Sequence, residues 1–61
     1  MSDQDIINAA YQDAVKNVFA VFLTSFVDAS NDQTQIAAAK QRFKTGIAVA
    51  RTVRDAALSL L

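Results

Sequence analysis

Small and apolar residues recur at alternating intervals of three and four through the second half of the chain. The series holds for eight positions without a polar residue. Residues with this spacing share one side of an α-helix, so the pattern predicts a helix over about 32–60 that packs along a heptad seam. The members of the seam are Ile36, Ala39, Phe43, Gly46, Ala50, Val53, Ala57 and Leu60.

Half of this seam consists of Ala and Gly. Small side chains allow the backbone of a second helix to approach closely, or they leave room for large side chains opposite. Gly46 inside a helix costs about 1 kcal/mol relative to Ala. We therefore expect a close packing contact at Gly46 that compensates for this cost.

The first half of the chain predicts a second helix, over about 3–29, with a broader apolar face. Ser2 precedes Asp3 and Asp5, which is typical of a helix start, because their oxygens accept hydrogen bonds from the exposed amides of the first turn. Leu23 and Val27 fall on the side opposite the centre of the face. The apolar face comprises Ile7, Tyr11, Ala14, Val15, Val18, Phe19, Val21, Phe22 and Phe26, together with Ser25.

One polar stretch separates the two helices: DASNDQTQ, residues 28–35. Asp, Ser, Asn and Thr favour turns and helix N-caps because their side chains hydrogen-bond to nearby backbone. We expect a turn at about 29–32, with Ser30 or Asn31 as the N-cap of the second helix. So short a turn makes the helices antiparallel, which predicts an all-α hairpin and a single domain over residues 1–61.

The segment VFAVFLTSFV, residues 18–27, has large apolar side chains at seven of its ten positions. A hairpin partner covers only one stripe of a helix, so this segment requires further neighbours. A chain of 61 residues without Cys also lacks disulfides as a source of stability, which leaves self-association. The sequence thus predicts a homodimeric four-helix bundle or a larger even-numbered oligomer. The predicted interface residues are Phe19, Phe22, Leu23, Phe26, Val27, Phe43, Gly46, Ala50, Val53 and Ala57.

In size and layout, the predicted hairpin resembles the Rop-type RNA-binding hairpins, which dimerise into such a bundle. The resemblance is one of architecture and includes no shared sequence motif. It implies an oligomeric regulator that binds nucleic acid.

Folding about residue 30 places residues 19–26 opposite residues 34–41. This alignment predicts that the bulky Phe19, Phe22 and Phe26 face the small run Ala37–Ala39. The charges also divide between the helices: the first has four Asp against Lys16, a balance of −3, and the second has five basic residues against Asp32 and Asp55, a balance of +3. We expect opposite charges to pair across the hairpin, for example Asp5 with Arg54.

The sequence offers little for catalysis or metal binding. His, Cys and Glu are all missing, so the common general bases and soft metal ligands are lacking, and we expect neither an enzyme nor a cofactor. Asp3 and Asp5 are interpreted as helix-start charges. The oxygen-rich stretch 28–32 lacks the central Gly and closing Glu of a calcium loop, so no metal site is predicted.

Three functions are compatible with this chemistry. The first is a structural or protein-interaction module built from copies of the chain. The second is nucleic-acid binding through Lys40, Lys44 and Arg51, which share one flank of the second helix, although no exposed aromatic residue is expected to be interleaved with them for base stacking. The third is an adaptor or inhibitor that packs against a different protein.

The sequence predicts a cytoplasmic location. The start, MSDQD, is acidic and does not resemble a secretory leader. The apolar run 18–27 is shorter than the roughly 20 residues that cross a bilayer, so no stable membrane insertion is expected.

Overall fold

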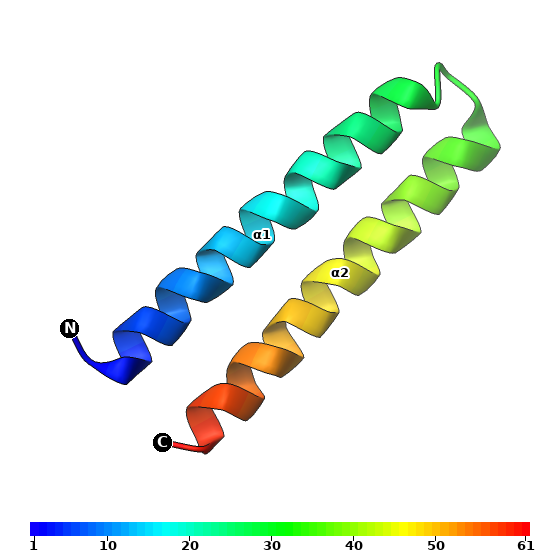
Figure 1. The fold of residues 1–61 in the computed structure, drawn as a ribbon. Helices are drawn as coiled ribbons and strands as arrows, with labels where there is room; N and C mark the ends of the chain where they lie inside the picture. Colours follow the sequence, from blue (N-terminus) through cyan, green and yellow to red (C-terminus); the bar gives the residue numbers. More distant parts are fainter.

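The computed structural model describes residues 1–61 and contains two α-helices, α1 (Asp3–Asp28) and α2 (Gln33–Ser59). They lie antiparallel, so both chain termini are at one end and the turn is at the other (Figure 1). The predicted all-α helical hairpin is confirmed, and each helix matches its expected range to within a residue at either end.

Ser2 caps α1 as the sequence predicts. Its hydroxyl oxygen accepts a hydrogen bond from the backbone N–H of Asp5 at 3.2 Å, and the Asp5 carboxylate accepts one from the Ser2 N–H at 3.4 Å. This reciprocal capping box satisfies two amides that the first helical turn leaves without partners.

The prediction that Ser30 or Asn31 caps α2 is wrong, because Asp32 takes this position. An oxygen of its carboxylate accepts hydrogen bonds from the N–H groups of Thr34 at 2.9 Å and Gln35 at 3.2 Å. Ser30 and Asn31 adopt φ angles of 47° and 70° instead. Reversing the chain requires these left-handed conformations, so neither residue can have the extended backbone of an N-cap.

Three side-chain contacts fix the register of the helices. Gly46 lies against Val18, the rings of Phe22 and Phe43 have centroids 4.8 Å apart, and the Arg54 guanidinium lies 4.4 Å from the centre of the Tyr11 ring. The predicted alignment of residues 19–26 with 34–41 is therefore wrong. The reversal is centred beyond residue 30, since the turn extends to Asp32, so Phe22 is level with Phe43 and not with Ala37–Ala39.

The predicted ion pairing across the hairpin is also wrong. The two ion pairs both join neighbours on one helix: Asp13 with Lys16 at 3.9 Å, and Arg54 with Asp55 at 3.0 Å. Arg54 is directed inward over Tyr11, where the electron-rich ring face attracts the cation. Its nearest carboxylate is then the adjacent Asp55, and not Asp5.

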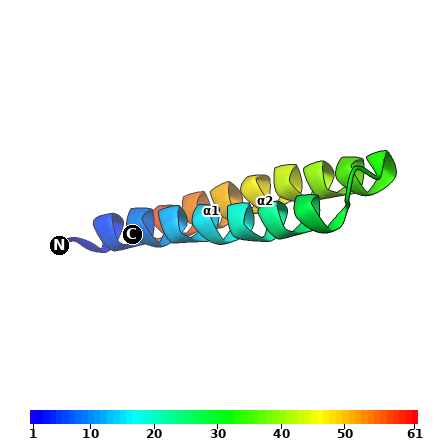
Figure 2. The same cartoon turned by 90° about the horizontal axis from the view of Figure 1, so that it is seen from above.

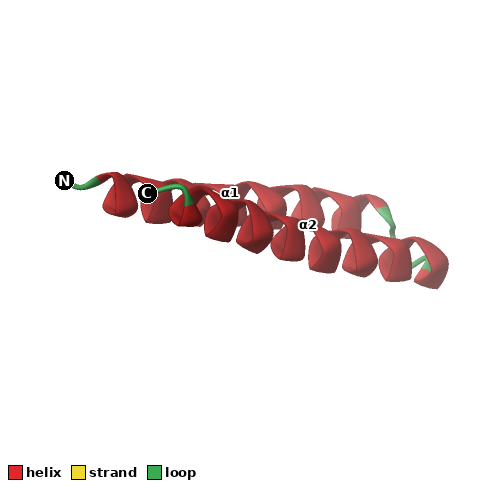
Figure 3. Ribbon diagram, turned by 90° about the horizontal axis from the view of Figure 1, so that it is seen from below, coloured by secondary structure: helices red, strands yellow, loops and turns green.

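The hairpin is one helix thick. The Cα trace measures 44 × 17 × 7 Å, and the edge-on views in Figures 2 and 3 show two helices with no further layer on either face. Only Ala29, Ile36 and Ala39 are buried. Nearly all of the large apolar side chains thus retain contact with solvent.

Replacing Asp32 with Ala is expected to lower the free energy of unfolding by about 1 kcal/mol, because the amides of Thr34 and Gln35 lose their acceptor. Asp32→Asn keeps an acceptor oxygen and serves as the control, with a much smaller loss. Thermal unfolding followed by circular dichroism measures both changes. Equal losses in the two variants would contradict the capping role of Asp32.

Candidate interaction surface

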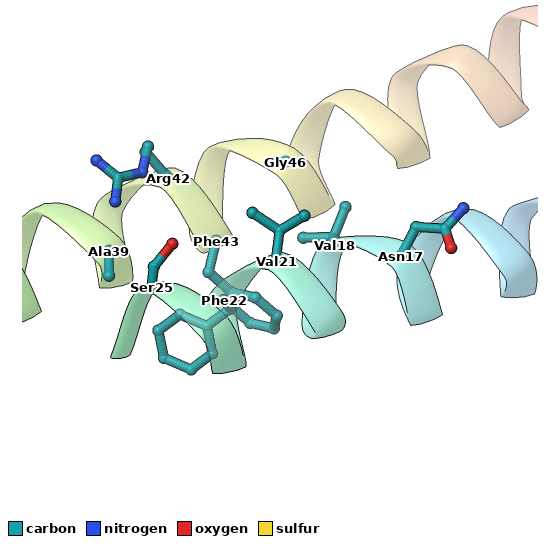
Figure 4. A pocket seen from close by; sticks show the side chains of 9 residues that line it. All are labelled: Asn17, Val18, Val21, Phe22, Ser25, Ala39, Arg42, Phe43 and Gly46. Atoms are coloured by element: carbon teal, nitrogen blue, oxygen red, sulfur yellow. The ribbon is translucent and has the colours of Figure 1, made fainter. Parts of the chain in front are cut away.

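One face of the hairpin is hollowed along the line where the helices meet. A hollow of about 270 Å³ lies toward the turn, and a second of about 450 Å³ lies toward the termini; Gly46 lines both. We call this side the groove face and define it by Val21 of α1 and by Arg42, Val49 and Val53 of α2, which line these hollows. Figure 4 shows the first hollow, with Val18 and Val21 projecting from α1 toward α2.

Gly46 is the point at which the two hollows meet. A Cβ atom at this position would lie only 3.0 Å from a methyl carbon of Val18, so a larger residue requires the Val18 side chain to shift by a few tenths of an ångström. The predicted close contact at Gly46 is thus present within the hairpin itself. The lack of a side chain also leaves a depression in the groove face between α1 and α2.

The heptad seam of α2 does not stay against α1 along its whole length. Ala39 is buried and Ala50 half-buried, but Val53 is 61% exposed and lies at the edge of the groove face. Arg54 faces α1 in its place. A straight helix with 3.6 residues per turn drifts by about 20° per heptad relative to a 3.5-residue repeat, which rotates the later seam residues away from α1.

The three Phe residues of α1, at positions 19, 22 and 26, differ in whether they face α2 or the solvent. Phe22 is half-buried and packs on Phe43, with the edge of Phe26 at a centroid distance of 5.8 Å. Phe19 is 54% exposed and Leu23 is 53% exposed. Of the predicted interface residues, Phe22, Phe43, Gly46, Ala50 and Ala57 thus face the partner helix at least in part, whereas Phe19, Leu23, Phe26, Val27 and Val53 are exposed.

The face opposite the groove, which we call the back face, carries both aromatic and basic side chains. Residues two apart on a helix point to nearly opposite sides, at about 100° per residue. Because Val21 and Arg42 are on the groove face, Phe19 and Lys44 are on the back face. Lys40, Arg51 and Phe26 share this face by their spacing of four or seven residues from Lys44 and Phe19. Lys40, Lys44 and Arg51 are exposed and form no ion pair.

Sequence reasoning missed Arg42 and Val49 as members of the groove face. Both lie outside the heptad seam, and only the register of the hairpin places them beside Val21. The signal in the sequence was the four-residue spacing of Val49 and Val53, which puts them on one side of α2.

Neither helix is long and apolar enough to cross a membrane. The structure contains no group of three or more acidic side chains arranged to hold a metal ion. Asp32, at the end of the oxygen-rich stretch 28–32, uses its carboxylate to cap α2.

Comparison of the chain with protein-family models, with curated proteins and with solved structures gives no match. The groove face and the back face are therefore interpreted from their own chemistry. The protein is a small helical hairpin that exposes apolar side chains on several sides.

Gly46→Ala is expected to have different effects in two backgrounds. In the native chain, the gain in helix propensity of about 1 kcal/mol is offset by the tight contact with Val18. In a Val18→Ala background the contact is relieved, so the same substitution should stabilise by the full amount of about 1 kcal/mol. Denaturant unfolding of the four proteins measures this difference, and identical gains in both backgrounds would show that Val18 does not restrict position 46.

Proposed function

We propose that the chain is a self-associating structural module whose working form is a homo-oligomeric helical bundle. The proposal rests on one observation: most of the large hydrophobic residues of the chain are exposed, and very few residues are buried. Three residues are buried, while eleven large hydrophobic residues are exposed. Exposed apolar surface on this scale is typical of interaction sites, because leaving it in water is unfavourable by about 25 cal/mol per Å².

A second copy of the chain is the simplest partner. Another hairpin laid on the first supplies two further helices, and the resulting four-helix bundle covers one apolar face of each copy. Leu23 and Val27, which point away from α2, then provide contacts for a larger even-numbered assembly. The module requires no cofactor, and its role is to hold copies of itself or attached partners together.

Native mass spectrometry of the purified chain at low salt is the direct test. The expected result is an even multiple of the 6.6 kDa chain mass, without bound ligand. A monomer at micromolar concentration would contradict self-association. A complex with a different protein from the same cells would favour the adaptor function instead.

Nucleic-acid binding by the back face is the second candidate, and one structural observation favours it. Lys40, Lys44 and Arg51 have no carboxylate partner, and the hairpin places the exposed Phe19 and Phe26 of α1 on the same face. Cations that contact phosphates, beside aromatic rings that stack on bases, are the usual components of a single-stranded nucleic-acid surface.

This second candidate predicts that Lys44→Gln weakens binding to a single-stranded RNA oligonucleotide and reduces the slope of log K against log salt concentration by about 1. Lys16→Gln removes the same charge from α1, outside the back face, and is expected to leave binding unchanged. Fluorescence anisotropy across a salt series measures both variants. Binding that does not depend on salt, or equal effects of the two substitutions, would exclude the back face as a nucleic-acid site.

A further inference from the structure

We infer that the groove face is the surface on which a second copy docks, and that the two turns lie at the same end of the resulting dimer. This inference rests on the proposed self-association and adds to it the face and the orientation. The groove face lies on the 44 × 17 Å plane of the hairpin, a rectangle of about 750 Å². A stable interface typically buries about 800 Å² per partner, so one full face of this hairpin is the area that a dimer requires.

In the half of the groove face nearer the termini, eight of the ten lining residues are hydrophobic, among them Ile7, Ala10, Ala14, Val49, Val53 and Ala57. The back face carries Lys40, Lys44 and Arg51, each without a carboxylate partner. Arg42 is the one basic residue of the groove face without a carboxylate partner, so covering this face buries fewer unpaired cations than covering the back face.

Two-fold symmetry allows two ways to stack the hairpins with their groove faces together. With the turns at opposite ends, α1 lies on α1 of the partner and α2 on α2. With the turns at the same end, each α1 lies on α2 of the partner. The charge of α1 is −3, from four Asp and Lys16, and that of α2 with its cap is +3, from five basic residues with Asp32 and Asp55. Like charges placed together weaken an interface, so the same-end arrangement is favoured.

A local feature supports the same orientation. Asp28 and Arg42 line a hollow near the turn, yet the two side chains form no ion pair within the hairpin. In the same-end dimer, Arg42 lies over the half of α1 that contains Asp28 of the partner subunit. In the opposite-end dimer, it lies over α2 of the partner, where the groove face is apolar. Only the first arrangement gives Arg42 an acidic neighbour.

Spin-label distance measurements distinguish the two arrangements. The chain has no Cys, so Gln33→Cys introduces a unique labelling site at the exposed start of α2. The same-end dimer predicts label separations within roughly 25 Å, given helices about 10 Å apart. The opposite-end dimer predicts a separation close to the 44 Å length of the hairpin. Ser59→Cys, at the other end of α2, is expected to give a short distance as well.

A mixture of the two labelled proteins serves as an internal control. Distances between a label at position 33 and one at position 59 should be long in the same-end dimer and short in the opposite-end dimer. A dimer with a long separation between the two labels at position 33 would overturn the inferred orientation and leave self-association standing. A chain without intermolecular distances at any concentration would overturn the proposed function itself.

The choice of face is tested by two matched substitutions on α1. Val21 lines the groove face and is 64% exposed, whereas Gln12 is also exposed but lies on the back face, seven residues before Phe19. Val21→Lys is expected to raise the dimer dissociation constant at least about tenfold, because it places a charge in the interface. Gln12→Lys adds the same charge to the back face and is expected to change the dissociation constant by less than about twofold, as for surface substitutions in general. Analytical ultracentrifugation measures both, and equal effects would overturn the assignment of the groove face.

Discussion

Two helices laid side by side share a single line of contact, and the rest of this structure depends on that constraint. Each helix buries one stripe against the other, whatever the composition of its remaining surface. In this chain the stripe includes Ala29, Ile36 and Ala39, which are buried, and several half-buried residues beside them. The large apolar side chains outside it remain exposed, and the hairpin has no further element to cover them. The stripe therefore stabilises the hairpin, and the rest of the apolar surface is available for contact with further helices.

The contact of Gly46 with Val18 determines how that surface is shaped. At this position the backbone of α2 approaches the side chain of α1 until a single added carbon atom would be 3.0 Å from its neighbour. Gly46 has no side chain, so this close approach leaves the space between the helices unfilled on the groove face. As a result the groove face is concave, with a hollow on either side of Gly46, while the rings of Phe19 and Phe26 are on the back face. The two faces thus differ in shape as well as in charge.

The acidic helix α1 and the basic helix α2 do not form ion pairs with each other, although their opposite net charges suggest that they would. Asp13 pairs with Lys16 on the same helix, and Arg54 pairs with its neighbour Asp55. The opposite net charges of α1 and α2 are instead available to select the orientation of a second hairpin. Exposed pairs contribute little to stability, about 0.2–1 kcal/mol each, but repulsion between like helices discriminates between otherwise similar arrangements.

Local interactions explain why the helices could be predicted from the sequence. The apolar spacing, the Ser2–Asp5 capping box and the polar interruption at 28–35 all act over a few residues, so they specify two helices and a turn without reference to the rest of the chain. The N-cap of α2, the register and the ion pairs were predicted wrongly, because each depends on how the chain reverses. Left-handed conformations at Ser30 and Asn31 moved the cap to Asp32 and the alignment by several residues, which brought Phe22 to Phe43 and Arg54 to Tyr11. The side of α2 that faces α1 was likewise settled only in three dimensions, because over 27 residues a straight helix rotates part of its heptad seam, including Val53, away from its neighbour.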